Sequence, residues 1–194
     1  MSTVFFDIDT QIDFLFPAGA LYVPGAERLL PALEQLNRYA AAHAIPVIST
    51  MDAHSEDDPE FAQWPAHCVV GAIGQQKPAA TLLDKRVVIS TAPGEYSIDG
   101  AQQILLEKQH LDLFTNPNLP GVLERLNAGR SVVYGVVTEY CVRCAVMGLL
   151  RQGKPVELVT DAIQSLDKEA ARRMLEELTA GGGRLTTVAE VCSG

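Results

Sequence analysis

The stretch STVFFDIDTQIDF, Ser2 to Phe14, places a short apolar run directly before a cluster of acids. A short run of β-branched and aromatic side chains is typical of a strand that is buried on both faces of a sheet. Asp9 and Asp13 then follow where such a strand should end. The stretch therefore predicts a central strand that delivers carboxylates to one edge of a sheet.

Strand-like and helix-like patterns alternate along the rest of the chain. Apolar residues recur at helical spacing from Gly25 to His43 and stop just before Pro46. The other expected strands are IPVISTM (45–51), QILLEK (103–108), SVVYGVV (131–137), PVELVT (155–160) and RLTTV (184–188), and the other expected helices cover 119–128, 140–152 and 168–179. KRVVIST (85–91) fits either a short extra strand or part of an insertion. This order predicts an α/β protein with three α/β/α layers, Rossmann-like in arrangement, around a mostly parallel central sheet.

Length and charge narrow the possible functions. A chain of 194 residues suits one domain with a substantial core, so we expect a single domain over 1–194 with a loop-rich insertion at about 52–100. The net charge is −9 and no run is rich in Lys or Arg, which argues against nucleic acid and anionic membranes as partners. No apolar stretch approaches ~20 residues and the N-terminus does not read as a signal peptide, so we expect a cytoplasmic protein.

Polar residues follow several of the expected strands. Asp9 follows the first strand, Asp52 the second, Lys108 closes the third, and 138–141 follow the fourth. In parallel α/β sheets, ligands bind outside the carboxyl ends of the strands. We therefore expect these side chains to converge on one edge of the sheet.

Cys141 lies where GVVTEYCVR turns from a strand into a helix. Unpaired N–H groups and the positive end of a helix dipole lower a thiol pKa and favour the reactive thiolate. Asp9 could supply a base and Lys108 a positive charge for such a nucleophile. Position alone also fits a buried helix cysteine. A redox pair with Cys144 is less well supported, because Val-Arg between the cysteines resembles ordinary helix.

The stretch DAHSEDDPEFAQWPAHC, Asp52 to Cys68, has neither helical nor strand periodicity. It offers two imidazoles and two carboxylates, a set suited to a divalent ion such as zinc, manganese or iron, although loop histidines can simply be solvated. The candidate ligands are Asp52, His54, Glu60 and His67. Trp64 in this stretch and Phe14 near the first acids can either cover the core or form walls of a pocket for a planar ligand.

Three blocks of sequence together resemble the isochorismatase-like cysteine hydrolase superfamily, and within it the nicotinamidases, also known as pyrazinamidases. The blocks are D-x-Q-x-D-F (9–14), D-x-H…W-P-x-H-C (52–68) and G-V-V-T-E-Y-C-V-R (135–143), and they span about three quarters of the chain. The second block points to the nicotinamidases rather than to metal-free relatives. The resemblance implies an isochorismatase-like fold over the whole chain.

The resemblance also implies a role for each site residue. Cys141 would be the nucleophile, Asp9 the base and Lys108 the cation that favours the thiolate. A cis peptide would join Val136 and Val137, and the N–H groups of Val137 and Cys141 would form the oxyanion hole. A divalent metal, zinc before manganese or iron, would bind Asp52, His54, Glu60 and His67, and the substrate ring would contact Phe14, Trp64 and Tyr140.

The implied reaction is hydrolysis of nicotinamide to nicotinic acid and ammonia through a thioester. One alternative is a related hydrolase that acts on another small amide, ureide or enol ether, with 52–67 a structural remnant that has no functional metal. Another is a non-catalytic binding domain. The expected partner is a small-molecule substrate, and the apolar helix face from Ala145 to Leu150 would suit self-association into a homo-oligomer.

Overall fold

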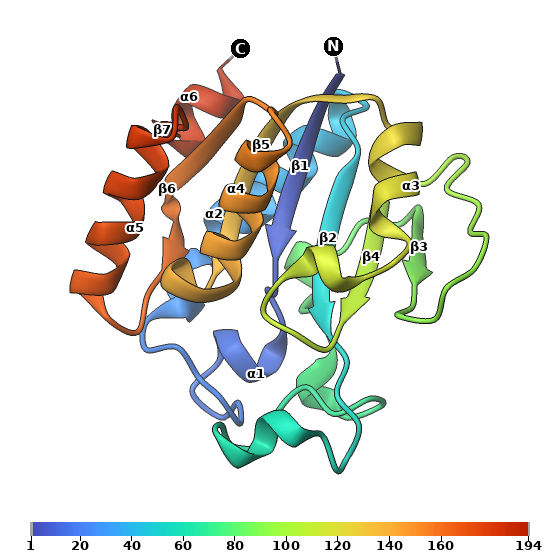
Figure 1. Cartoon of the computed structure of the whole chain (residues 1–194), viewed down its shortest axis with the longest axis vertical. Coiled ribbons are helices and arrows are strands. Elements are labelled where there is room, and N and C mark those ends of the chain that lie inside the picture. Colours follow the sequence, from blue (N-terminus) through green and yellow to red (C-terminus); the bar gives the residue numbers. More distant parts are fainter. Residues whose placement is uncertain (1, 194) are drawn as a thin grey trace.

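A parallel sheet forms the centre of the protein (Figure 1). The computed structural model describes residues 2–193, within which seven strands lie in the order β3-β4-β2-β1-β5-β6-β7. Every neighbouring pair in this order is parallel, which confirms the predicted sheet. The strands are β1 (Ser2–Ile8), β2 (Val47–Asp52), β3 (Arg86–Ile89), β4 (Gln103–Lys108), β5 (Ala128–Val136), β6 (Val156–Gln164) and β7 (Arg184–Thr186).

Helices cover both faces of the sheet, as the three-layer prediction requires. In Figure 1, α3, α4 and α5 lie in front of the sheet and α2 lies behind it. The α-helices are α1 (Ile12–Leu15), α2 (Leu30–Ala42), α3 (Leu119–Arg125), α4 (Arg143–Arg151), α5 (Lys168–Ala180) and α6 (Val188–Cys192). Short 3₁₀ helices occupy Ala26–Leu29, Pro59–Ala62, Ile73–Gln75, Ala79–Thr81 and Leu113–Thr115, and a π-helical turn occupies Thr138–Val142.

The apolar side chains of β1 belong to two separate hydrophobic cores, one on each face of the sheet. Val4, Phe6 and Ile8 are buried with residues of α3, α4 and α5 on one face. Phe5 is buried with residues of α2 and α6 on the other face. Successive side chains of a strand point to opposite faces, so a continuous apolar run is what a strand covered on both faces requires.

Several element boundaries differ from the predictions. KRVVIST proves to contain an edge strand, β3, and the short helices α1 and α6 were not predicted. The helix expected over 119–128 ends at Arg125, because β5 begins as early as Ala128. The helix expected over 140–152 begins with the π-helical turn, and α4 follows from Arg143.

The apolar face of α4 lies inside this chain and not on its surface. Ala145, Val146 and Leu149 are fully buried, packed over the sheet with the other residues of that core. The sequence feature that suggested a homo-oligomer therefore belongs to the protein's own core. Within residues 2–193, no helix is long and apolar enough to cross a membrane.

The carboxyl ends of the strands meet at the lower edge of Figure 1, where α1 and the segment between β2 and β3 lie. The four strands after which site residues were predicted, β4, β2, β1 and β5, are consecutive neighbours in the sheet. The chain builds outward from β1 on one side and then returns to start β5 on the other side. Such a switch point is where open α/β sheets form a binding crevice.

Candidate active site

The strand ends bring four of the predicted residues together. Asp52 and Lys108 occupy paired positions on β2 and β4. Asp9 follows β1 directly and has a positive φ of 48°, which turns the chain away from the sheet. Cys141 lies in the π-helical turn that follows β5.

The Lys108 ammonium is the centre of this group. Its Nζ lies 2.8 Å from Oδ2 of Asp9 and 3.6 Å from Sγ of Cys141, and it also donates a hydrogen bond to Oδ1 of Asp52. An ammonium has three N–H donors, so these contacts can occupy all of them. Lys108 is only 1% exposed, and a buried cation of this kind needs such partners. The predicted meeting of Asp9, Lys108 and Cys141 is thus present.

Burial and the neighbouring charges set the protonation of the carboxylates and of the lysine. Burial alone would lower the pKa of Lys108, but the Asp52 and Asp9 carboxylates raise it well above its ordinary value. Burial raises the pKa of Asp9, and the nearby Lys108 cation offsets only part of this effect. The pKa of Asp52 falls to about 2, because Lys108 and His54 outweigh the effect of burial. Lys108 therefore stays charged, and Asp9 binds a proton more readily than an ordinary aspartate.

The Cys141 thiol differs from the expected thiolate. Burial raises the pKa of Cys141 well above its ordinary value, and the carboxylates of Asp9 and Asp52 raise it further. Lys108 acts in the opposite direction but does not outweigh them. The resting thiol therefore holds its proton more tightly than an ordinary cysteine.

The turn that carries Cys141 borders a pocket. The peptide between Val136 and Val137 is cis, as predicted. Both valines line the pocket together with Asp9 and Cys141. Cys141, which is 6% exposed, therefore borders a cavity. Val137 and Cys141, the residues expected to supply the oxyanion hole, border the same space.

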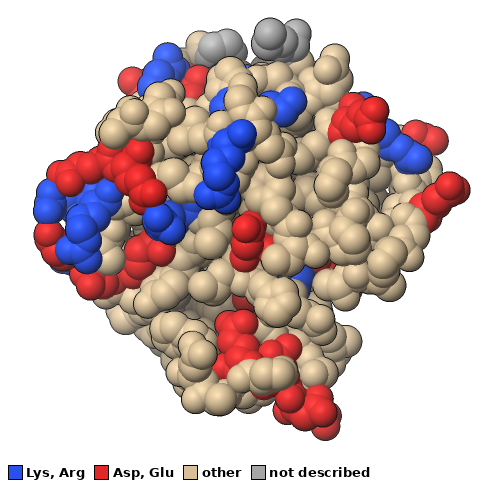
Figure 2. Space-filling view, in the orientation of Figure 1, with Lys and Arg blue, Asp and Glu red and all other residues tan. Residues whose placement is uncertain are grey.

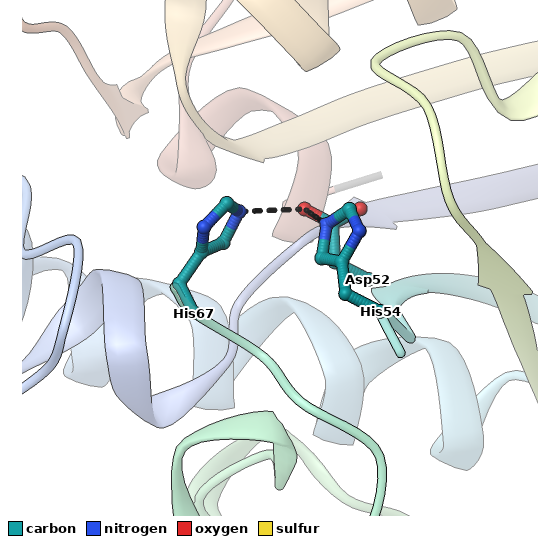
Figure 3. Close-up of side chains that lie close together, drawn as sticks. All are labelled: Asp52, His54 and His67. Atoms are coloured by element: carbon teal, nitrogen blue, oxygen red, sulfur yellow. Dashed lines mark ion pairs between the residues drawn. The ribbon is translucent and has the colours of Figure 1, made fainter. Parts of the chain in front are cut away.

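A second group, Asp52, His54 and His67, lies beside the first. Figure 3 shows both imidazole rings turned towards the Asp52 carboxylate. Nε2 of His54 and Nε2 of His67 each lie 3.9 Å from Oδ2 of Asp52. All three residues are buried, and their ligand atoms lie within 4.8 Å of one another. The structure thus brings together three of the four predicted metal ligands.

The hydrogen bonds of the two histidines suit metal binding. Nδ1 of His67 lies 2.8 Å from the Pro65 carbonyl oxygen, which can only accept, so this nitrogen carries the proton. Nδ1 of His54 lies 2.9 Å from Oδ2 of Asp58. Burial lowers the pKa of His54, but the Asp52 and Asp58 carboxylates raise it to about 9, so a metal ion would replace a proton on its Nε2. That nitrogen is buried without a hydrogen-bond partner within residues 2–193. One carboxylate and two imidazoles are ligands that zinc and similar ions take, so the donor set fits a divalent ion.

Glu60, the fourth predicted metal ligand, is not grouped with Asp52 and His67. Its carboxylate groups with His54 and Asp58, and it lines the pocket. Asp58, for which no role was predicted, contacts the His54 ring and also accepts a hydrogen bond from the Glu60 N–H. In the sequence, Asp58 followed by Pro59 is a pair typical of a helix start, which indicates that the Asp58 side chain caps a helix.

Two residues of the first sequence block hold the segment with the candidate metal ligands in place. Gln11 makes two hydrogen bonds with the backbone of Asp52, at 2.7 and 2.9 Å, and a third with the Gln75 carbonyl. Asp13 accepts hydrogen bonds from the N–H groups of Cys68 and Ala20. No role was predicted for either side chain, because their partners are distant backbone groups that leave no mark in a local pattern.

The three predicted substrate-binding aromatic residues all line the pocket. The rings of Trp64 and Tyr140 meet edge to face with centroids 5.6 Å apart. The ring of Phe14 lies 5.5 Å from that of His67. Planar walls of this kind suit a small aromatic ligand held next to Cys141.

The pocket opens where the protein is acidic. The segment from Asp52 to His67 carries five acidic residues and no Lys or Arg. Figure 2 shows acidic surface at the lower end of the molecule, below the strand ends. A negative potential at the mouth favours neutral or cationic ligands over anions.

Known proteins resemble this chain over almost its whole length. The isochorismatase domain model matches residues 3–190. The nicotinamidase of Escherichia coli (strain K12) is 23% identical over 204 residues, which cover 94% of this chain and 93% of that protein. The nicotinamidase of Acinetobacter baylyi is 22% identical over 196 residues, which cover 90% of this chain and 87% of that protein.

Solved structures agree with this relationship. The pyrazinamidase of Pyrococcus horikoshii in complex with zinc is 25% identical, with a TM-score of 0.82 and coverage of 96% of this chain and 99% of that one. The nicotinamidase of Bacillus subtilis is 19% identical, with a TM-score of 0.83 and coverage of 96% and 99%, and shares the fold. Because the domain match covers nearly all of the sequence, the protein belongs to the isochorismatase family and is similar to the nicotinamidases within it.

Proposed function

We propose that the protein hydrolyses nicotinamide to nicotinic acid and ammonia, with Cys141 as the nucleophile. The protein is a hydrolase of amide C–N bonds, as its similarity to nicotinamidases over nearly their whole length indicates. The observation that carries the finer proposal is that one pocket is bordered by Cys141, Asp9 and His67 together with the aromatic residues.

The first half-reaction starts from the protonated thiol. Asp9 takes the Cys141 proton as the sulfur attacks the carboxamide carbon, and its raised pKa makes it a better acceptor for this proton. Lys108 stays charged beside the sulfur and the two carboxylates and so limits the build-up of negative charge. The N–H groups of Val137 and Cys141 receive the developing oxyanion. Asp9 then returns the proton to the leaving nitrogen, the C–N bond breaks, and ammonia leaves a thioester on Cys141.

The second half-reaction reverses these roles. Asp9 takes a proton from a water molecule, whose oxygen attacks the thioester carbon. The C–S bond breaks, nicotinic acid is released, and the sulfur recovers its proton from Asp9. In each half-reaction Asp9 accepts one proton and returns it, so the reaction needs no other proton carrier.

Asp52, His54 and His67, with Glu60 nearby, would hold a divalent metal next to the ring-binding part of the pocket. When bound, such an ion supplies a Lewis acid that can coordinate a ring nitrogen and withdraw electrons from the ring. Phe14, Trp64 and Tyr140 would hold the ring plane so that the carboxamide reaches the sulfur. The acidic mouth further supports an uncharged amide over an anionic substrate.

Ammonia release from nicotinamide tests this proposal, measured on protein purified without chelator and again after chelation and metal return. We expect hydrolysis that depends on Cys141 and recovers with the metal. Hydrolysis of other amides or ureides but not of nicotinamide, by protein with no recruitable metal, would instead support the metal-free alternative.

A further inference from the structure

Glu139 lies two residues before Cys141, in the same π-helical turn. Its Oε1 accepts hydrogen bonds from the N–H groups of Leu166, at 2.9 Å, and Asp167, at 2.7 Å. Its Oε2 is shielded from solvent and has no hydrogen-bond partner within residues 2–193. Nothing in the reaction described above uses this carboxylate, although it adjoins the nucleophile.

The segment that Glu139 holds forms part of the pocket. Leu166 lines the pocket at its mouth and is 43% exposed. Asp167 is also exposed, and its carboxylate accepts hydrogen bonds from the N–H groups of Glu169 and Ala170 at the start of α5. Burial therefore does little to hold this segment, whereas two hydrogen bonds to a carboxylate hold it strongly.

A second connection joins the start of α4 to α5. Arg143 donates two hydrogen bonds, each of 2.9 Å, to the carboxylate of Glu177, and the two side chains are 44% and 48% exposed. Solvent screens this exposed pair. Glu177 lies within helix α5 and not in the segment that carries Leu166, so this connection does not hold the pocket wall.

We infer that Glu139 is a positioning residue that holds Leu166 against the nucleophile turn and so sets the width of the pocket beside Cys141. This inference rests on the proposed function for its substrate, a small planar carboxamide. Leu166 forms one wall of the pocket, so a small planar ring packs closely against it and bulkier amides do not fit. Without Glu139, the wall loosens, the small ring binds less tightly, and bulkier reagents reach the sulfur.

The variants Glu139→Ala and Glu139→Gln test this inference, because Gln keeps an oxygen in the place of Oε1 and Ala does not. In Glu139→Ala we expect KM for nicotinamide to rise about tenfold with kcat within about threefold of wild type, the pattern of lost uniform binding. Glu139→Gln should restore most of the affinity. Glu177→Ala, which removes the exposed connection, should leave both constants unchanged.

A second measurement does not depend on nicotinamide. The rate of Cys141 modification by a bulky maleimide is compared with that by iodoacetamide, using the tryptic peptide of Cys141. Arg143 separates this peptide from Cys144. We expect the ratio of the maleimide rate to the iodoacetamide rate to rise in Glu139→Ala. It should also rise in Leu166→Ala, which removes the exposed wall side chain directly.

The outcomes separate the two claims. Wild-type protein that does not hydrolyse nicotinamide would refute the proposed function, while the modification rates would still test Glu139. Active wild type with unchanged KM and unchanged reagent selectivity in Glu139→Ala would overturn the inference alone. A fall in kcat and in iodoacetamide modification without a change in KM would also overturn it, because Glu139 would then act on the nucleophile and not on the wall.

Discussion

Asp9, Lys108 and Cys141 lie at or shortly after the ends of strands β1, β4 and β5, whereas His54 and His67 lie on an irregular segment between β2 and β3. The strand ends are set by backbone ladders, such as the pairing of Asp52 with Lys108. The irregular segment has only one bridge of this kind, between His54 and Val69, within the described residues.

The irregular segment is held in place by side chains from the first sequence block (9–14) instead of by pairing between strands. Gln11 clamps Asp52 and reaches Gln75, and Asp13 holds Cys68 directly after His67. Lys77 is buried and binds Thr10 at 2.9 Å and Asp7 at 3.4 Å, which fixes the end of the segment beneath β1. The two halves of the site share Asp52, which contacts Lys108 and is also a candidate metal ligand, but are otherwise held by different contacts. Damage to a residue other than Asp52 in one half should therefore leave the other half nearly intact.

Removing the nucleophile should have the largest effect. In Cys141→Ala we expect hydrolysis to fall by a factor of about 10⁴ or more, because loss of a covalent nucleophile leaves only binding and electrostatic contributions. Metal binding, measured by competition titration, should be unchanged, since Cys141 is not among the ligands. A large loss of metal affinity in this variant would break the proposed separation of the two halves.

Neutralising Asp9 should slow catalysis and yet make the sulfur more reactive. Asp9→Asn removes the base, so hydrolysis should fall about 10³-fold. Because the Asp9 carboxylate raises the pKa of Cys141, its loss should lower that pKa and speed modification by iodoacetamide at neutral pH. The pH dependence of modification measures the shift, and a slower reaction throughout the range would contradict the assigned charges.

Loss of a candidate metal ligand should leave the reactivity of the Cys141 sulfur unchanged. In His67→Ala we expect affinity for a divalent ion to fall by more than about 100-fold, since a direct ligand is lost. The iodoacetamide reactivity of Cys141 in metal-free protein should match that of metal-free wild type. Unaltered metal affinity would remove His67 from the site.

The smallest effect should come from the residue that orients His54. Asp58→Asn removes the charge that faces Nδ1 of His54 but retains an oxygen able to accept the Glu60 N–H. We expect metal affinity to fall about 10- to 100-fold. Asp57→Asn, an exposed neighbour, is the matched control and should have no effect. Equal losses in both variants would indicate a general charge effect.

Local pattern predicted the elements that place the nucleophile. The alternation of strands and helices defined where each strand ends, and a parallel sheet brings such ends to one edge. Asp9, Asp52, Lys108 and Cys141 were found in this way, and their meeting required no knowledge of the strand order.

The remaining features depend on contacts between distant parts of the chain. The raised pKa of Cys141 results from burial and from two carboxylates. Its position at a helix start indicated only a lowered pKa, because neither the burial nor the carboxylates are visible in the local sequence. The hydrogen bonds of Gln11 with Asp52 and of Asp13 with Cys68 join residues that are 41 and 55 positions apart along the chain. No role was predicted for Asp58, because its contact with His54 depends on the folded shape of an irregular segment.

The central claim is that the Cys141 sulfur attacks the carboxamide carbon. Mass spectrometry of protein quenched during turnover of nicotinamide tests it most directly. The account predicts a nicotinoyl group on the Cys141 peptide, absent from Cys141→Ala. Wild-type-like ammonia release by Cys141→Ala, with no acyl group found on the wild-type peptide, would contradict it.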